Sequence, residues 1–189
     1  MSAETLSPVT LALDSFVQRL TESCANDGWP QLPFDPEWPS PCWQQEADEG
    51  VMTLWKPVRQ TAVNDMFDRL SEALETDIHP DIGDYYSRYW SDPLPARAAQ
   101  GELSLLQVWN PEDLERLRAN LIGHALEKRR RRLPLTLFFA VTLPDGNLIL
   151  SLDNADGSIW LEAPGKPPHQ RLADSLADFL LTLDPLPFD

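Results

Sequence analysis

The amino-acid sequence predicts an α+β fold in which an antiparallel β-sheet of about four to six strands is flanked by α-helices. Two turn signals near the C-terminus, at residues 144–147 and 154–157, separate three short apolar runs, as in a β-meander. Other segments repeat apolar residues at helical spacing. The 189 residues contain no internal repeat and no clear linker, so we expect a single domain over residues 1–189.

The first helix is predicted to begin at Ser7, which can cap a helix that has Pro8 at its first position. Its buried face is formed by apolar residues at helical spacing: Val9, Leu13, Phe16, Val17 and Leu20. Residues 29–43 then hold five prolines, three tryptophans and one phenylalanine. This composition predicts an irregular segment docked on the domain, and residues 51–55 predict a strand.

The middle of the chain predicts two helices. Asn64 can cap the first, whose apolar face is Met66, Phe67, Leu70 and Leu74. A shorter helical segment follows Pro80 and runs through three tyrosines: Tyr85, Tyr86 and Tyr89.

The second half of the chain has clearer signals. Residues 103–109 predict a strand, and Asn110 with Pro111 begins a long helix that must end before Pro134. Strands are expected at 135–141, 148–152 and 158–161. A last helix is predicted from its apolar residues, which are Leu172, Leu176, Phe179 and Leu180.

The charge is large and unevenly distributed. The formal net charge is −15, and residues 1–115 hold 21 acids and 6 bases, whereas residues 116–189 hold 9 of each. Phosphates would be repelled from most of such a surface, so we expect no nucleic-acid partner. Basic proteins are the expected partners.

Motifs of catalysis and cofactor binding are absent from the sequence. It contains no GxSxG, GxxxxGK[ST] or HExxH pattern, and its three histidines are far apart. We therefore expect no enzyme activity, no cofactor, no metal and no small-molecule substrate. The N-terminus shows no export signal, so we expect a cytoplasmic protein in which Cys24 and Cys42 are buried thiols.

Three groups of side chains remain as candidates for binding, and each has two interpretations. The acids near residues 46–49, 77–84 and 112–113 form either an ordinary solvated surface or a negatively charged concave face. The aromatic residues at 85–90 either pack in the core or hold basic side chains of a partner. The basic run at 128–132 either complements the negative end of its helix or binds an anion.

The chain resembles the SecY-interacting Syd proteins of proteobacteria. The resemblance is carried by LLQVW at 105–109, NLIGH at 120–124, LPLTLF at 133–138 and, less centrally, PSPC at 39–42 and LADSLADFL at 172–180. It covers most of the chain and is strongest over residues 103–183.

The resemblance implies a fold similar to the SUKH superfamily and a non-enzymatic protein of the cytoplasm and the cytoplasmic face of the inner membrane. Such a protein associates loosely with the membrane by binding cytoplasmic loops of SecY, and it sequesters or proofreads channels that are not properly assembled. The family's acidic groove suggests these candidate binding residues: Glu112, Asp113, Asp81, Asp84, Asp48 and Glu49, with Tyr85 and Tyr86 as supporting aromatics.

Two alternatives stay open. A SUKH-type immunity protein would use a similar acidic cleft to bind and neutralise a toxin domain. A nucleic-acid or lipid binder would instead depend on the basic run at 128–132.

Overall fold

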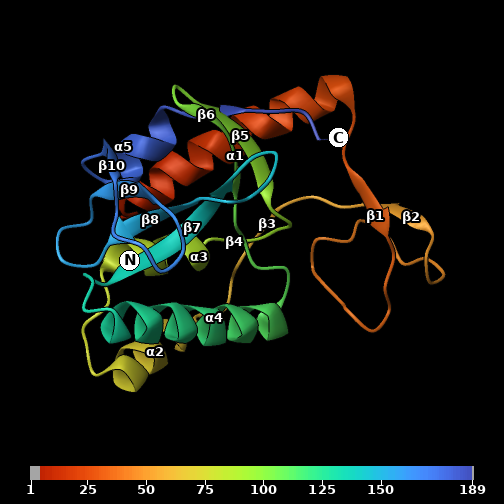
Figure 1. Ribbon diagram of the computed structural model, residues 1–189. Helices are drawn as coiled ribbons and strands as arrows, with labels where there is room; N and C mark the ends of the chain where they lie inside the picture. The colour runs from red at the N-terminus through yellow and green to blue at the C-terminus, as the bar shows by residue number, and fades with distance from the viewer. Residues whose placement is uncertain (1–4, 189) are drawn as a thin grey trace.

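A seven-stranded antiparallel sheet organises the fold, as the computed structural model of the chain shows for residues 5–188 (Figure 1). Its strand order is β10-β9-β8-β7-β6-β5-β11. The seven strands are β5 (Leu94–Ala98), β6 (Gly101–Leu105), β7 (Thr136–Thr142), β8 (Ile149–Asp153), β9 (Ile159–Glu162), β10 (Gln170–Ala173) and β11 (Asp184–Pro185). The predicted α+β class with an antiparallel sheet is confirmed, although the sheet has more strands than expected.

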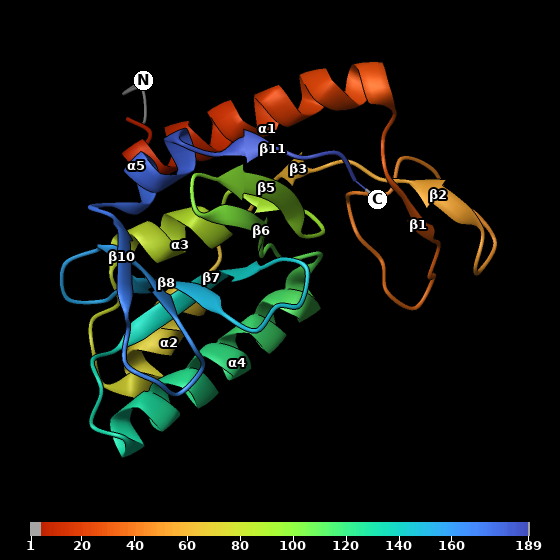
Figure 2. The same cartoon turned by 45° about the horizontal axis from the view of Figure 1, so that its top comes forward.

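Five helices pack around this sheet. They are α1 (Pro8–Asp27), α2 (Met66–Leu74), α3 (Pro80–Tyr86), α4 (Pro111–Arg130) and α5 (Leu176–Leu181). The two outermost strands, β10 and β11, contact α5 and α1 respectively, and these two helices pack on each other. The sheet therefore curls so that both of its edges approach the same helix pair. Helix α4 packs on β7 and carries α2 beside it, on the far side of the molecule from α1 in both views (Figure 2).

Helix α1 matches its prediction at both ends. The Ser7 Oγ accepts a hydrogen bond from the Thr10 backbone N–H at 3.2 Å. Gly28, with φ of 102°, ends the helix in a conformation that favours glycine. The predicted apolar face is buried, and Leu13 and Phe16 are both 0% exposed.

Residues 29–56 form a long arm that projects from the body of the domain (Figure 1). It contains a two-stranded hairpin of β1 (Gln31–Pro33) and β2 (Met52–Leu54), joined by an ordered irregular stretch. The docked irregular segment and the strand near 51–55 are thus confirmed. Strand β1 was not predicted, because three residues that end in a proline do not show an alternating pattern.

Three predicted elements have different limits in the structure. The N-cap residue of α2 is Asp65 and not the predicted Asn64. Asn64, one residue earlier, still stabilises the start of the helix, because its side chain accepts a hydrogen bond from the Met66 N–H at 3.2 Å. Tyr89 leaves the predicted third helix and joins the short strand β4 (Tyr89–Trp90), which pairs with β3 (Val58–Arg59). The strand expected over 103–109 ends at Leu105.

The C-terminal meander is confirmed, and one residue in it changes element. Leu172 belongs to β10 and not to the last helix, because α5 begins only after the Ser175 cap, whose Oγ accepts from the Asp178 N–H at 3.1 Å. Strand β5 was also missed, since Pro95 and Arg97 interrupt its apolar pattern. Within residues 5–188, no helix is both long enough and apolar enough to cross a membrane.

Candidate protein-binding site

The arm is fastened to the body at the N-terminus of α4. The Ser40 hydroxyl donates to the Trp109 carbonyl at 2.6 Å, and the Asn110 side chain donates to the Pro39 carbonyl at 2.9 Å. The Trp109 indole N–H points to the Trp38 carbonyl at 3.4 Å. These contacts place an acidic, aromatic segment beside the first turn of a helix that is distant in sequence.

Aromatic rings fill the joint between arm and body. Trp43 meets Trp109 edge-on, with ring centroids 5.1 Å apart, and Trp109 meets Trp55 at 5.8 Å. Phe188 packs on Trp55 at 5.4 Å, so the C-terminal end of the chain covers the same cluster. Edge-to-face packing of this kind stabilises the joint beyond the area it buries.

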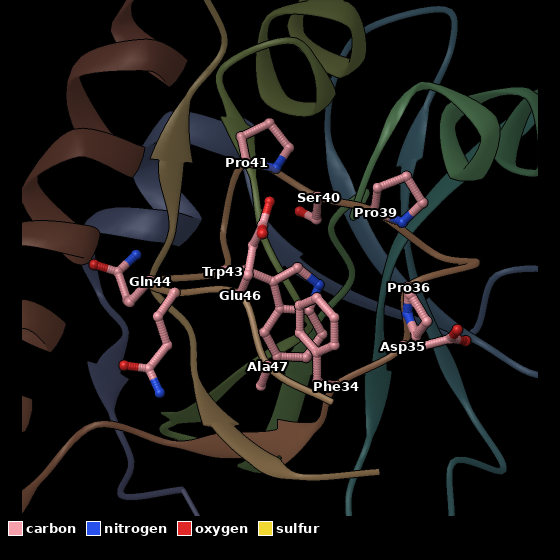
Figure 3. Close-up of a pocket in the computed structure, with 11 residues that line it drawn as sticks. Phe34, Asp35, Pro36, Pro39, Ser40, Pro41, Trp43, Gln44, Glu46 and Ala47 are labelled. Carbon is pink, nitrogen blue, oxygen red and sulfur yellow. The ribbon is translucent and has the colours of Figure 1, made fainter. Parts of the chain in front are cut away.

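A cavity of about 620 Å³ lies within the arm (Figure 3). Its walls come from one stretch of chain, residues 34–47, and are Phe34, Asp35, Pro36, Pro39, Ser40, Pro41, Trp43, Gln44, Gln45, Glu46 and Ala47. The lining contains carboxylates and aromatic rings but no basic side chain. Its size falls in the range of ligand-binding pockets, about 300–1,000 Å³.

The first turn of α4 carries two of the predicted acids. Asn110 caps the helix by accepting from the Asp113 N–H at 2.8 Å, and the Asp113 carboxylate in turn accepts from the Trp109 N–H at 2.8 Å. Glu112 is exposed and makes no such contact in the structure. Both negative charges stabilise the positive end of the helix, whatever else they do.

A third acid, Asp92, lies near Asp113 and was not among the predicted site residues. Burial, and then the nearby Asp113, raises the pKa of the Asp92 carboxyl to about 6. Burial also raises the pKa of the Cys42 thiol to about 11, and the charge of Asp92 adds to that shift. Asp92 therefore links the acids of α4 to the arm. Its sequence context, directly before a proline in a loop, offered no signal of this position.

We use the name acidic face for the acids of the arm together with those at the part of the body where the arm docks. They are Asp35, Glu37, Glu46, Asp48 and Glu49 of the arm with Asp92, Glu112 and Asp113 of the body. Residues 29–55 contain five acids and no lysine, arginine or histidine. Two bases next to the arm lie over its tryptophan rings, Arg116 over Trp38 at 4.2 Å and Lys56 over Trp29 at 4.7 Å from the ring centroid.

The other two predicted acids are not part of this face. The backbone N–H of Asp81 donates to His79 Nδ1 at 3.3 Å, and His79 in turn donates its own N–H to the Asn154 side chain at 2.8 Å. Asp81 therefore lies by the β8–β9 turn. Asp84 lines a separate hollow with Thr10 and Arg88. Of the other four predicted acids, Glu112 and Asp113 lie in the first turn of α4, where residues 38–40 of the arm dock, and Asp48 and Glu49 lie next to the β1–β2 hairpin of the arm.

Tyr85 and Tyr86 require a correction. Both are 0% exposed, and their hydroxyls donate to the carbonyls of Leu106 and Phe138, each at 2.9 Å. Burial raises the pKa of both phenols, so the hydroxyls stay protonated. Both rings belong to the core and are closed to a partner, because α3 presents them to β7 instead of to solvent.

The basic run at 128–132 is largely engaged within the protein. Lys128 is 1% exposed and pairs with Glu162, while Arg130 and Arg131 pair with Glu127. Arg129 donates to the Leu74 carbonyl at 2.8 Å and thereby ties α4 to α2. These contacts favour the structural reading of the run over anion binding.

Metal and thiol chemistry receive no support from the described residues. Over residues 5–188, no group of three or more His, Cys, Asp or Glu side chains is arranged to hold a metal ion. Cys24 and Cys42 are free and buried, as expected, and burial raises the pKa of each thiol. Protonated buried thiols are poor nucleophiles.

Comparison with known proteins agrees with the sequence motifs. Residues 10–185 match the family described as Syd protein (SUKH-2). The chain is 41% identical over 188 residues to Protein Syd of Pseudoalteromonas atlantica, which spans 97% of this chain and 99% of that relative. It is 42% identical to Protein Syd of Alteromonas mediterranea over 178 residues, or 94% and 97% of the two chains. The resemblance is confirmed, and the chain belongs to the Syd family.

Proposed function

We propose that this protein binds lysine- and arginine-rich cytoplasmic loops of the translocon subunit SecY through the acidic face and performs no catalysis. The observation that carries the proposal is the joining of the base-free arm to the acidic first turn of α4 by the hydrogen bonds of Ser40 and Asn110. Family membership supports SecY as the partner, because SecY binding is what the Syd resemblance implies.

Electrostatics supports a basic, loop-like partner. Cytoplasmic loops of membrane proteins are enriched in lysine and arginine, which complement a face with eight acids. Exposed acids mainly accelerate the encounter, and salt screens them over about 10 Å at 0.1 M. Binding should therefore be fast at low salt and weaken as salt rises.

The cellular consequence belongs to the same proposal. A soluble domain that holds the loops of unassembled or abnormal SecY would sequester or proofread these channels. Its membrane association would be peripheral and loose, because it would run through SecY and not through lipid. The anionic inner leaflet would itself repel the acidic face.

The test is capture of detergent-solubilised SecY complex by the purified protein at low and moderate salt. Asp113 supports the Trp109 backbone, so the charge-reversal variant uses three exposed acids instead, Asp48→Lys/Glu49→Lys/Glu112→Lys. The matched control reverses three exposed acids on α1 and α2, Glu22→Lys/Asp68→Lys/Glu72→Lys. Both variants change the net charge equally.

Salt-sensitive capture that only the first variant loses would support the proposal. Equal loss in both variants would show that total charge matters and the acidic face does not. No capture by the unmodified protein would overturn SecY as the partner. The SUKH-2 label of the family then favours the other candidate, an immunity protein that binds a toxin domain in solution.

A further inference from the structure

The cavity within the arm has a wall of aromatic side chains and a carboxylate beside it. Phe34 and Trp43 are half-buried, and their ring centroids lie 5.2 Å apart at an angle of 52°. In Figure 3 the Glu46 carboxylate points toward Ser40 and Pro41, across the part of the cavity next to Trp43. The Asp35 carboxylate points away from the other labelled side chains and accepts from the Glu37 N–H at 2.9 Å. Of the two carboxylates that line the cavity, Glu46 is therefore the one that extends alongside Trp43 into it.

The arm already uses its tryptophans to hold cations. Arg116 lies over Trp38 and Lys56 over Trp29, at 4.2 Å and 4.7 Å from the ring centroids. Among residues 5–188, no lysine or arginine lies over Phe34 or Trp43. The one aromatic wall in the arm that faces a cavity and an acid thus lacks the cation that its neighbours have.

The cavity is held open by the backbone of the arm. Phe34 and the chain near residue 50 are joined by two hydrogen bonds, from Phe34 N to Val51 O at 2.9 Å and from Gly50 N to Phe34 O at 2.8 Å. At the other side, Ser40 accepts from the Cys42 N–H at 3.1 Å while it donates to Trp109. Three lining prolines restrict the backbone further. A ligand would meet a wall that needs little rearrangement, which lowers the entropic cost of binding.

We propose that this cavity binds one arginine side chain of the partner, with the guanidinium stacked on the Phe34–Trp43 wall and paired with Glu46. The inference deepens the proposed function, since it rests on a basic loop as the partner and names the side chain that anchors it. Arginine fits better than lysine, because its planar guanidinium stacks on aromatic rings and forms two parallel hydrogen bonds to one carboxylate. The guanidinium is also more weakly hydrated than an ammonium group, so arginine loses less hydration free energy than lysine when it enters the cavity.

The test uses three acetylated and amidated pentapeptides that differ only at the central position of Gly-Ser-X-Ser-Gly, where X is arginine, lysine or citrulline. Citrulline keeps the shape of arginine and removes its charge. Binding to the full chain is followed by the NMR chemical shifts of residues 34–47. We expect the arginine peptide to shift the Phe34 and Trp43 signals and to bind about tenfold more tightly than the citrulline peptide, with lysine between them.

Two variants separate Glu46 from general charge. Glu46→Gln should reduce arginine-peptide affinity about tenfold, to the level of citrulline, whereas Glu72→Gln, at an exposed acid of α2 outside both the cavity and the acidic face, should change it less than about twofold. Equal affinity of the arginine and citrulline peptides would overturn the proposal, as would equal effects of the two variants. Arginine binding in the cavity without SecY capture would support the pocket and overturn SecY as partner. SecY capture without arginine binding in the cavity would overturn the pocket alone.

Discussion

Lys128 Nζ lies 2.7 Å from Glu162 Oε2, and these side chains are 1% and 0% exposed. The pair joins α4 to the end of β9 beneath the basic run. Glu162 also accepts from the hydroxyls of Thr136 at 2.6 Å and Ser151 at 3.0 Å, and Lys128 donates to the Lys166 carbonyl at 3.1 Å. Full hydrogen bonding of this kind is what makes a buried ion pair tolerable.

Removing one partner of this pair should destabilise the protein strongly. Lys128→Met leaves the Glu162 carboxylate buried without its cation, which typically costs about 3–5 kcal/mol. Urea denaturation should show an earlier midpoint with an unchanged slope. Arg130→Met is the matched control, because Arg130 is exposed and pairs with Glu127 at the surface. Equal midpoints for the Lys128 variant and the unmodified protein would contradict a structural role of the pair.

His124 should make the protein less stable in mild acid. Thr136 donates its one hydroxyl proton to Glu162, so it accepts from His124 Nε2 at 3.1 Å. Burial lowers the pKa of His124, with Lys128 acting in the same direction and Glu162 opposing it. His124 therefore takes up a proton at a higher pH in the unfolded chain than in the folded protein. The free energy of unfolding consequently falls as the pH drops below about 6.5.

Two variants test this effect of pH on stability. The difference in urea midpoint between pH 7.5 and pH 5.5 should shrink in His124→Gln, which keeps a donor and does not titrate. It should persist in His169→Gln, because His169 is exposed. An unchanged difference in the His124 variant would assign the effect to other groups.

Asp92 should oppose stability at neutral pH. Burial and Asp113 raise its pKa from 3.8 to about 6, so the folded state holds a proton that the unfolded state releases above its lower pKa. Its destabilising effect is complete above about pH 6 and absent below about pH 4. Asp92→Asn should therefore raise the free energy of unfolding by about 1–3 kcal/mol at pH 7.5 and much less at pH 4.

The Asp92 effect is measured by urea denaturation at both pH values, with Asp48→Asn as the exposed control. A gain of equal size at both pH values would mean that the carboxylate charge is not its cause. Protonation near pH 6 should also weaken SecY capture in mild acid, and Asp92→Asn should be less sensitive to that change.

The basic run should be dispensable for partner binding. Arg130 and Arg131 are exposed and pair with Glu127, while Arg132 is exposed. Arg130→Gln/Arg131→Gln/Arg132→Gln should leave SecY capture unchanged at both salt concentrations. Loss of capture would contradict this prediction and would support lipid or anion binding by the basic run at the C-terminal end of α4.

Local patterns predicted most of the fold. The caps at Ser7 and Asn110 act within one helical turn, so they could be predicted from the sequence, whereas the Ser175 cap was not predicted and Leu172 was placed in the last helix. The meander strands are short apolar runs separated by turn residues, which is also local information. Strand β5 was not predicted because Pro95 and Arg97 interrupt its apolar pattern, and the two-residue strand β11 was not predicted because it is defined only by its pairing with β5, far back along the chain.

The candidate site was predicted only in part, for the same reason. An acidic pair at the start of α4 and acids in the arm are readable from composition, but Asp81 and Asp92 look equivalent in sequence. In the structure Asp81 lies near the β8–β9 turn, whereas Asp92 lies near the N-terminus of α4, because the chain between them runs from one site to the other. The burial of Tyr85 and Tyr86 likewise depends on which side of α3 faces β7.

The sequence by itself determined the fold class, the family and the excess of negative charge, because these follow from short-range periodicity, motifs and counting. Only the tertiary structure decided which acids lie where the arm meets the body, that Lys128 is a buried partner of Glu162, and that residues 34–47 enclose a cavity. The first two features depend on contacts between residues distant in the chain, and the cavity depends on how one irregular stretch folds back on itself; the pattern of charged and aromatic residues specifies neither. Ser40 and Trp109, 69 positions apart, are held together by one hydrogen bond that composition cannot reveal.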